Sequence, residues 1–148
     1  MNIGRGGINL IEKYEGFRAK MYLDAVGLPT IGYGTLIDTV AEEYLKTATL
    51  TKEQAEDLLR KDVAKFEQTV NLCVKVPLTQ NQFDALLCFV YNIGPYAFQK
   101  SSLLMSINSK LGKDVITTNW MKWTRAGGKV LKGLVTRRQE EVNLYFTA

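Results

Sequence analysis

The first apolar positions of the chain recur at helical spacing. Ile8, Ile11 and Tyr14 fall on one face, with Leu10 beside them. Gly16 follows Glu15 at the position where a left-handed residue commonly ends a helix. The pattern predicts a short helix that ends at Glu15.

Two longer helices are predicted behind matching N-terminal signals. The tetrads Thr51-Lys52-Glu53-Gln54 and Thr79-Gln80-Asn81-Gln82 both fit a capping box, in which a hydroxyl and an amide side chain satisfy the first free backbone amides. Apolar residues behind the first tetrad share a helical face from about residue 52 to 70. Those behind the second continue to Ile93, where Gly94-Pro95 ends the run, so this segment is the best candidate for a buried central helix.

The remaining segments are short. Residues 19–23 and 28–33 are β-prone and are separated by a turn, which predicts a small hairpin or meander. Helical patterns recur at about residues 40–46, 102–111, 115–123 and 134–146, with breaks at Gly112 and Gly127-Gly128. The predicted fold class is therefore α+β, with a small N-terminal strand lobe, a larger C-terminal helical lobe and a cleft between them.

Length and composition favour one globular domain. The chain has 148 residues, of which 46% are hydrophobic and 23% are charged, and this balance supports a compact core. We therefore expect a single domain, residues 1–148, with two lobes. No apolar run reaches the roughly 20 residues that span a bilayer, and the N-terminal residues lack the apolar stretch of a signal peptide, so synthesis in the cytoplasm is expected. The two cysteines, Cys73 and Cys88, are expected to be reduced thiols.

The chain contains no histidine. This excludes Ser-His-Asp hydrolysis, Cys-His chemistry and the histidine-ligated zinc of many amidases and peptidases. Carboxylates become the leading candidates for acid–base catalysis.

The net charge of +4 is unevenly distributed. Residues 1–98 carry 10 Lys and Arg against 12 Asp and Glu, whereas residues 99–148 carry 9 against 3. A basic region is most often a solvated surface, but it also attracts anionic polymers such as nucleic acid or the acidic groups of a bacterial envelope.

Three residues form the candidate constellation for chemistry. Glu15 is expected at the end of a helix, where the helix dipole and burial against Tyr14 and Phe17 both favour the protonated acid. A protonated acid is what the departure of a sugar hydroxyl requires. Asp24 is expected in the turn after the first strand, and glycoside hydrolysis uses such a carboxylate pair. Taken singly, each of Glu15, Asp24 and Thr30 is better explained as an ordinary exposed helix residue, turn residue or strand residue.

The segment that contains these residues resembles the catalytic signature of the phage-type lysozymes. The likeness consists of Glu-Gly-x-Arg at 15–18, Tyr-x-Asp at 22–24 and Pro-Thr-Ile-Gly-Tyr-Gly at 29–34. It continues in residues 78–86, in Tyr91-Asn92-Ile93-Gly94, and in Trp123 followed by residues 133–141. The resemblance therefore covers nearly the whole chain.

The resemblance implies a muramidase fold and a role for individual residues. It implies that Glu15 is the general acid, Asp24 the second catalytic carboxylate, and Thr30 the residue that positions a water molecule. Arg137 falls on the family's C-terminal arginine, which is expected near the acid, with Arg138 as the second candidate for that place.

Two further positions bear on the resemblance. Asn92 falls where family members often place an amide in the substrate cleft. Many members have a histidine directly after the Gly-x-Gly, and here Thr35 takes its place, so an ion pair made by that histidine is absent.

The aromatic and glycine-rich segments have simpler interpretations. Trp120 and Trp123 suit either sugar stacking or the core, and we expect at least one of them in the core. The glycines at residues 4–7 and 32–34 lack the context of a phosphate loop, so turn and backbone-fit roles are expected.

The expected activity is hydrolysis of the β-1,4 bond between N-acetylmuramic acid and N-acetylglucosamine in peptidoglycan, with inversion and with no metal or cofactor. The expected biology is a phage endolysin made in the host cytoplasm that reaches the cell wall through a holin-type lesion; a prophage remnant and an antibacterial effector delivered by other machinery are the alternatives. We expect a monomer whose partner is peptidoglycan, with attraction of the basic C-terminal region to an anionic envelope and with no nucleic-acid or integral-membrane role.

Two alternative functions are weighed. A lytic transglycosylase would break the same bond without a bound water, and Asp24 and Thr30 argue against it. A non-catalytic module that binds glycan or nucleic acid is disfavoured by the intact set of Glu15, Asp24 and Thr30, and by the lack of a nucleic-acid recognition motif.

Overall fold

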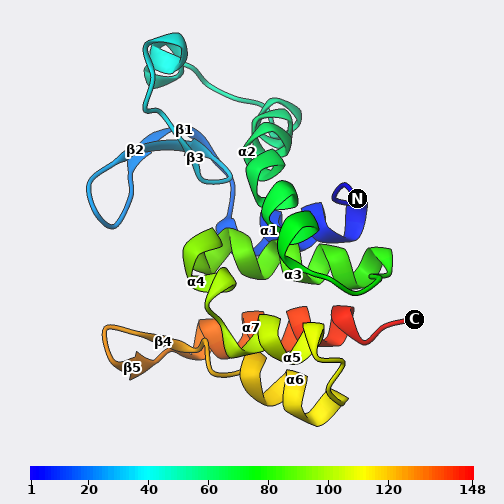
Figure 1. Ribbon diagram of the computed structural model, residues 1–148. Coiled ribbons are helices and arrows are strands. Elements are labelled where there is room, and N and C mark those ends of the chain that lie inside the picture. The colour runs from blue at the N-terminus through cyan, green and yellow to red at the C-terminus, as the bar shows by residue number, and fades with distance from the viewer. The chain divides into compact units, whose positions relative to one another are not determined.

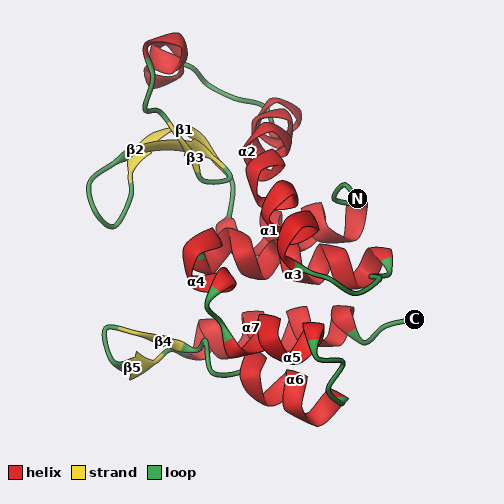
Figure 2. Cartoon of the chain, in the orientation of Figure 1, coloured by secondary structure: helices red, strands yellow, loops and turns green.

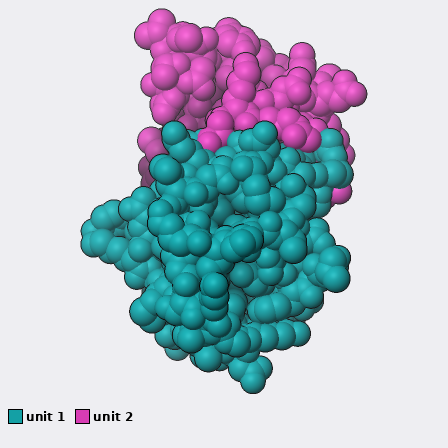
Figure 3. All heavy atoms as spheres, turned by 45° about the vertical axis from the view of Figure 1, so that its right-hand side comes forward, with its two compact units in different colours: residues 1–8, 65–148 teal, residues 9–64 magenta.

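The computed structural model describes residues 1–148, which divide into two compact units. Unit 1 comprises residues 1–8 and 65–148, and unit 2 comprises residues 9–64; Figure 3 distinguishes them. The first helix, α1 (Arg5–Glu15), contributes residues to both units, as does the second, α2 (Lys52–Cys73). Figure 1 shows the course of the chain.

Unit 2 contains a small antiparallel sheet in the order β1 (Arg18–Leu23), β2 (Pro29–Gly32) and β3 (Thr35–Leu36). It is drawn in yellow in Figure 2. The register pairs Tyr22 with Thr30, and Thr30 with Leu36. A short 3₁₀ helix, η1 (Val40–Lys46), follows the sheet. The predicted strand region and the helical segment after it are therefore confirmed.

The sheet packs closely on the first part of α2. Gly32 has a φ of +68°, and a Cβ there would lie 3.1 Å from the Cβ of Ala55, so only glycine fits this backbone without strain. Leu59 on α2, Ile31 on β2 and Leu45 on η1 are buried residues of the same unit. The capping box at the start of α2 forms as expected, since the Gln54 amide donates to Thr51 Oγ1 and the Thr51 amide donates to Gln54 Oε1.

Unit 1 is built around α3 (Gln80–Ile93), whose contacts with α7 (Lys132–Tyr145) are the most extensive between any two elements. Every residue of α3 from Phe83 to Val90 is buried, which confirms the prediction of a central helix behind the Thr79 capping box. The helices α4 (Pro95–Gln99), α5 (Ser102–Asn108) and α6 (Lys113–Trp120) complete the helical part of this unit. Trp120 is fully buried, so the expectation that at least one tryptophan lies in the core is confirmed.

Two elements of unit 1 differ from the expectation. The predicted end of the run at Gly94-Pro95 is confirmed, since α3 ends at Ile93, but a further helix that was not expected follows at once. Pro95 is the first residue of α4, a position that suits its fixed φ and missing amide hydrogen. Gly127 and Gly128 do not form a simple break. They have φ values of 58° and 79° and make the tight turn of a hairpin between β4 (Arg125–Ala126) and β5 (Lys129–Val130).

The N-terminus of α1 is held from α3. Asp84, which is 1% exposed, accepts hydrogen bonds from the backbone amides of Gly4 (2.8 Å) and Gly7 (3.1 Å). These amides have no partner within the helix, so the Asp84 side chain, which belongs to α3, caps the N-terminus of α1. The glycines at residues 4 and 7 allow the approach, because a Cβ on either would lie 2.9 Å from an atom of the Asp84 side chain.

No helix of the structure is long and apolar enough to span a bilayer. Both cysteine thiols are free; Cys88 is buried and Cys73 is partly exposed.

Candidate active site

Glu15 is the last residue of α1 and is half-buried. Gly16 follows it with a φ of +75°, and its amide donates to the carbonyl of Glu12 at 3.0 Å. This is the left-handed helix end that the sequence predicts. The local geometry therefore presents Glu15 at the point where the chain leaves the helix.

Tyr33 holds the last turn of α1 within unit 2. Its ring packs on Phe17 with the centroids 5.6 Å apart, and its hydroxyl forms a hydrogen bond with the Glu12 carboxylate. Burial, and then the charge of Glu12, raise the pKa of Tyr33 above its usual value. Glu12 lies one turn before Glu15, so Tyr33 ties the end of this helix to the sheet region, a contact that the sequence analysis did not identify.

Asp24 lies in the turn between β1 and β2, where it also has a structural role. Its Oδ1 atom accepts hydrogen bonds from the backbone amides of Val26 and Leu28, each at 2.9 Å. Gly27, with a φ of +84°, lets the chain reverse inside this turn. The carboxylate is thus fixed by its own loop, with one oxygen engaged.

Thr30 lies on β2 and is 3% exposed. Its hydroxyl donates to the carbonyl of Leu28 at 2.9 Å. The same carbonyl accepts the Asp24 amide at 2.9 Å, while the Leu28 amide donates to Asp24 Oδ1. The backbone of one residue, Leu28, therefore joins the two side chains that the sequence analysis associates with the attacking water.

Arg137 and Asn92 belong to unit 1. Arg137 is 4% exposed; its Nε lies 3.3 Å from Glu141 Oε2, and its Nη2 donates to the Cys88 carbonyl at 3.1 Å. Asn92 is exposed near the end of α3, and its Oδ1 accepts a hydrogen bond from Arg138 Nη2. The roles of Arg137 beside the acid and of Asn92 in the substrate cleft stay predictions.

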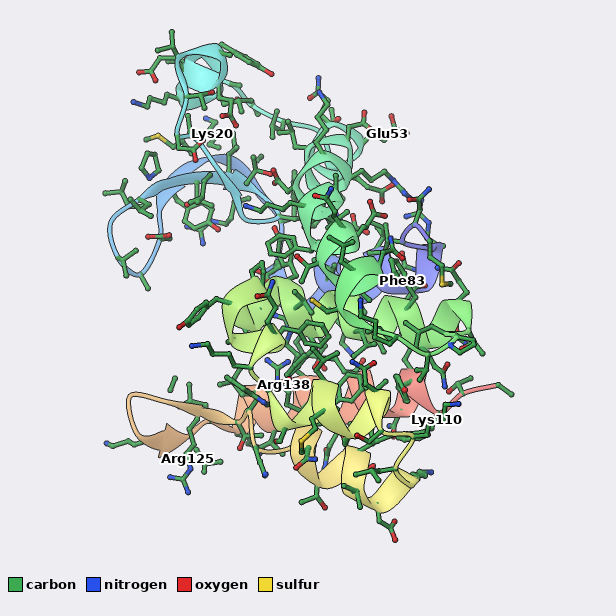
Figure 4. All side chains as sticks on the ribbon, in the orientation of Figure 1. Lys20, Glu53, Phe83, Lys110, Arg125 and Arg138 are labelled. Atoms are coloured by element: carbon green, nitrogen blue, oxygen red, sulfur yellow. The ribbon has the colours of Figure 1, made fainter.

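Arg138 forms a buried network that the sequence analysis did not predict. It lies between α3 and α7 (Figure 4) and is fully buried, with Nη1 2.6 Å from Glu141 Oε1 and Nε donating to the Trp123 carbonyl at 2.9 Å. Glu141 also accepts the indole N–H of Trp120 at 3.0 Å. The only signal in the sequence is the placement of Arg137 and Arg138 three to four residues before Glu141, a spacing that brings side chains together on a helix.

Burial dominates the electrostatics of this network. It lowers the pKa of Arg138, and the charge of Glu141 opposes that change. Burial and the same Glu141 charge raise the pKa of the Cys88 thiol well above its usual value. Cys88 therefore stays a neutral thiol, and a buried neutral thiol is a poor nucleophile.

Comparison with known proteins decides the family. The family model described as phage lysozyme matches residues 12–141. The chain belongs to the phage lysozyme family. It is 44% identical to the endolysin of Bacillus phage PZA over 149 residues and 35% identical to the endolysin of Salmonella phage P22 over 147 residues.

The two relatives differ in how much of their own length this phage lysozyme matches. It spans about half the length of the Bacillus phage endolysin, since the match covers 98% of this chain and 55% of that protein. The match to the Salmonella phage endolysin covers 99% of both.

Solved structures agree with the family. A crystal structure of a P22 lysozyme variant has a TM-score of 0.89 at 34% identity, and the muramidase domain of SpmX from Asticaccaulis excentricus has 0.88 at 36% identity; each match covers 99% of both chains. The predicted family and the lysozyme-like α+β fold class are therefore confirmed. The predicted enzyme class, lysozyme, is also the one named for the P22 structure.

Proposed function

We propose that residues 1–148 act as a single muramidase domain that hydrolyses the β-1,4 bond between N-acetylmuramic acid and N-acetylglucosamine in peptidoglycan. Family membership supports the reaction class. The observation that carries the mechanism is the arrangement of Asp24 and Thr30 around the Leu28 backbone.

The hydrogen-bond directions at Thr30 suit it to hold a water molecule. Its own proton is committed to the Leu28 carbonyl, so the lone pairs of Oγ1 are the groups left to interact with water. A water there donates one hydrogen to Thr30 Oγ1 and the other to the carboxylate of Asp24. Its oxygen lone pair then faces the substrate.

Asp24 is proposed as the general base. Because Oδ1 already accepts two backbone amides, Oδ2 is the oxygen that takes the proton from the attacking water. The fixed turn holds that oxygen in place without a further conformational change, which is the form in which a base contributes most to the rate.

Glu15 is proposed as the general acid that protonates the departing glycosidic oxygen. Arg137 is proposed as its supporting cation and Asn92 as an amide that binds the glycan. In this scheme water attacks the face of the sugar opposite Glu15, so the anomeric carbon inverts.

We further propose that the chain acts as a phage endolysin. It is made in the host cytoplasm, reaches the cell wall through a holin-type lesion, and acts there as a monomer. Its basic C-terminal region is attracted to the anionic envelope, where electrostatic steering raises the local concentration of enzyme.

The decisive experiment is a turbidity assay on purified peptidoglycan followed by mass spectrometry of the digest. We expect clearing and products with free reducing ends. A 1,6-anhydro end would show a transglycosylase instead, and an unchanged suspension would overturn the proposed activity.

A further inference from the structure

The hairpin β4–β5 and the residues that flank it carry only positive formal charge. Lys122, Arg125, Lys129 and Lys132 lie within eleven residues, and no acidic residue occurs between Asp114 and Glu140. The four cations are all exposed. Figure 4 labels Arg125 on this hairpin, with its side chain extending away from the helices of the same unit. We call residues 122–132 the basic hairpin.

The basic hairpin also exposes apolar side chains. Val130 is 53% exposed and Leu131 is 44% exposed. The register pairs Arg125 with Val130, so these two side chains share one face of the hairpin. Leu131 continues the ladder through its amide, which donates to the Thr124 carbonyl at 2.9 Å, and it therefore falls on the face of Lys129. Each face thus combines a cation with an exposed apolar residue.

The start of α7 adds to the positive potential. Its first turn contains Lys132 and no acidic residue, and Leu131 at the N-cap supplies no side-chain hydrogen bond. The positive end of the helix dipole is therefore not neutralised by the chain itself. Helix termini are usually complemented by the opposite charge, so this arrangement lowers local stability unless an anion approaches.

We propose that the basic hairpin binds the surface of a membrane rich in anionic phospholipid. This inference gives a surface and a ligand to the envelope attraction proposed above and rests on it, but it does not depend on muramidase activity. The cations meet the headgroups, while Val130, on the face that it shares with Arg125, enters the boundary of the acyl region. The stems of Lys129 and Lys132 can cover apolar surface while their ammonium groups stay in the headgroup layer.

The exposed apolar residues favour a lipid surface over a nucleic acid. A nucleic acid would engage the cations through its phosphates and would gain nothing from Val130 or Leu131. A lipid surface uses the cations and the apolar face together, and the contribution of Val130 is the part that salt does not screen.

The test is sedimentation of the full chain with vesicles of phosphatidylcholine alone and of an equimolar mixture with phosphatidylglycerol. The variant is Lys129→Gln with Lys132→Gln, and the matched control is Lys61→Gln with Lys65→Gln, which removes the same charge from exposed positions on α2. We expect binding to the mixed vesicles only. Each hairpin lysine should contribute about fivefold to partitioning, so the double variant should bind about 25-fold more weakly and the control should change much less.

A second variant tests the apolar part. Val130→Thr keeps the shape and charge of the hairpin, and we expect it to reduce the binding that remains at high salt. Equal loss in the hairpin variant and the control, equal binding to both vesicle types, or an unchanged Val130→Thr variant would each overturn the proposal. Hydrolysis of lipid-free peptidoglycan by the same variants should equal that of the wild type, so a failure of the muramidase proposal is seen separately.

Discussion

Thr35 donates a hydrogen bond from its hydroxyl to the Asp62 carboxylate at 2.6 Å, and this bond links β3 to α2. Thr35 is 2% exposed. It occupies the position where the family resemblance leads one to expect a histidine. A hydroxyl–carboxylate hydrogen bond therefore joins the sheet to the helix at this point, with no imidazole involved.

Replacement of Thr35 by Val should lower the free energy of unfolding by about 1–3 kcal/mol, because the valine keeps the shape but leaves Asp62 without this donor. The loss should be similar throughout the range of about pH 5 to 8 in which a histidine would titrate. Chemical denaturation across that range measures it. Thr118→Val, at an exposed position on α6, is the control, and a loss no larger than in that control would contradict the interpretation.

Glu15→Gln should give a folded protein with little lytic activity, because the amide keeps the shape of the side chain but cannot donate the proton. Loss of a general acid should lower the rate by at least about 10² to 10⁴. Clearing of peptidoglycan measures the rate, and circular dichroism checks the fold. Near-wild-type clearing would show that another group is the acid.

The first product released should be the α-anomer. Attack by a water held at Thr30 and Asp24, on the face opposite Glu15, inverts the β-linked anomeric carbon in one displacement. Proton NMR of the fresh digest, recorded before mutarotation, distinguishes the anomers. Initial appearance of the β-anomer would mean that Asp24 acts as a nucleophile or that the mechanism differs.

Alanine substitutions at two neighbouring glycines of α1 should have opposite effects. At Gly7 a Cβ would lie 2.7 Å from Ile3 Cγ1 and 2.9 Å from Asp84 Cβ, so Gly7→Ala should destabilise the protein by about 1–3 kcal/mol. At Gly6 the nearest Asp84 atom would lie at 3.6 Å, an ordinary contact, so Gly6→Ala should be neutral or stabilising by up to about 1 kcal/mol. Thermal unfolding of the two variants compares them, and equal effects would refute the close fit at Asp84.

Alkaline pH should destabilise the protein through Tyr33. Its folded-state pKa is raised above 10.0 by burial and by Glu12, so its contribution is complete below pH 10.0 and is lost as the pH rises toward the folded-state value. Tyr33→Phe should lower the free energy of unfolding by about 1 kcal/mol at neutral pH, and the further loss of stability at alkaline pH should be smaller than in the wild type. Denaturation at neutral and alkaline pH tests this, with Tyr44→Phe, at a 65% exposed position, as the control. An alkaline decline of wild-type size in Tyr33→Phe would contradict the assignment.

The features that could be predicted from the sequence are those that a few neighbouring residues determine. The Thr51–Gln54 and Thr79–Gln82 boxes and the Gly16 helix end are local arrangements, and each forms as expected. The hairpin at Gly127-Gly128 was missed because two glycines suit a break as well as a tight turn. The helix end at Gly94-Pro95 was predicted, but α4 was missed because Pro95 both follows one helix and starts the next.

Contacts between residues far apart in the sequence could not be predicted from the pattern of apolar and polar positions. Arg138 reaches Asn92 across 46 positions, and Asp84 reaches Gly7 across 77. Apolar periodicity predicts that α3 is buried, but it does not show which polar side chains of α7 meet it inside the contact. For Glu15, Asp24 and Thr30, the family resemblance supplied the assignment, and the arrangement at Leu28 became visible only in the structure.

The anchor of α1 also has a consequence for synthesis on the ribosome. Gly4 leaves the exit tunnel before its hydrogen-bond partner Asp84, which lies 80 positions later. Since domains generally fold as units during translation, the hydrogen bonds from Asp84 to the start of α1 form only after the whole of unit 2 has been made. Glu15 lies at the other end of this helix, so the helix that carries it is fully anchored only when α3 has emerged.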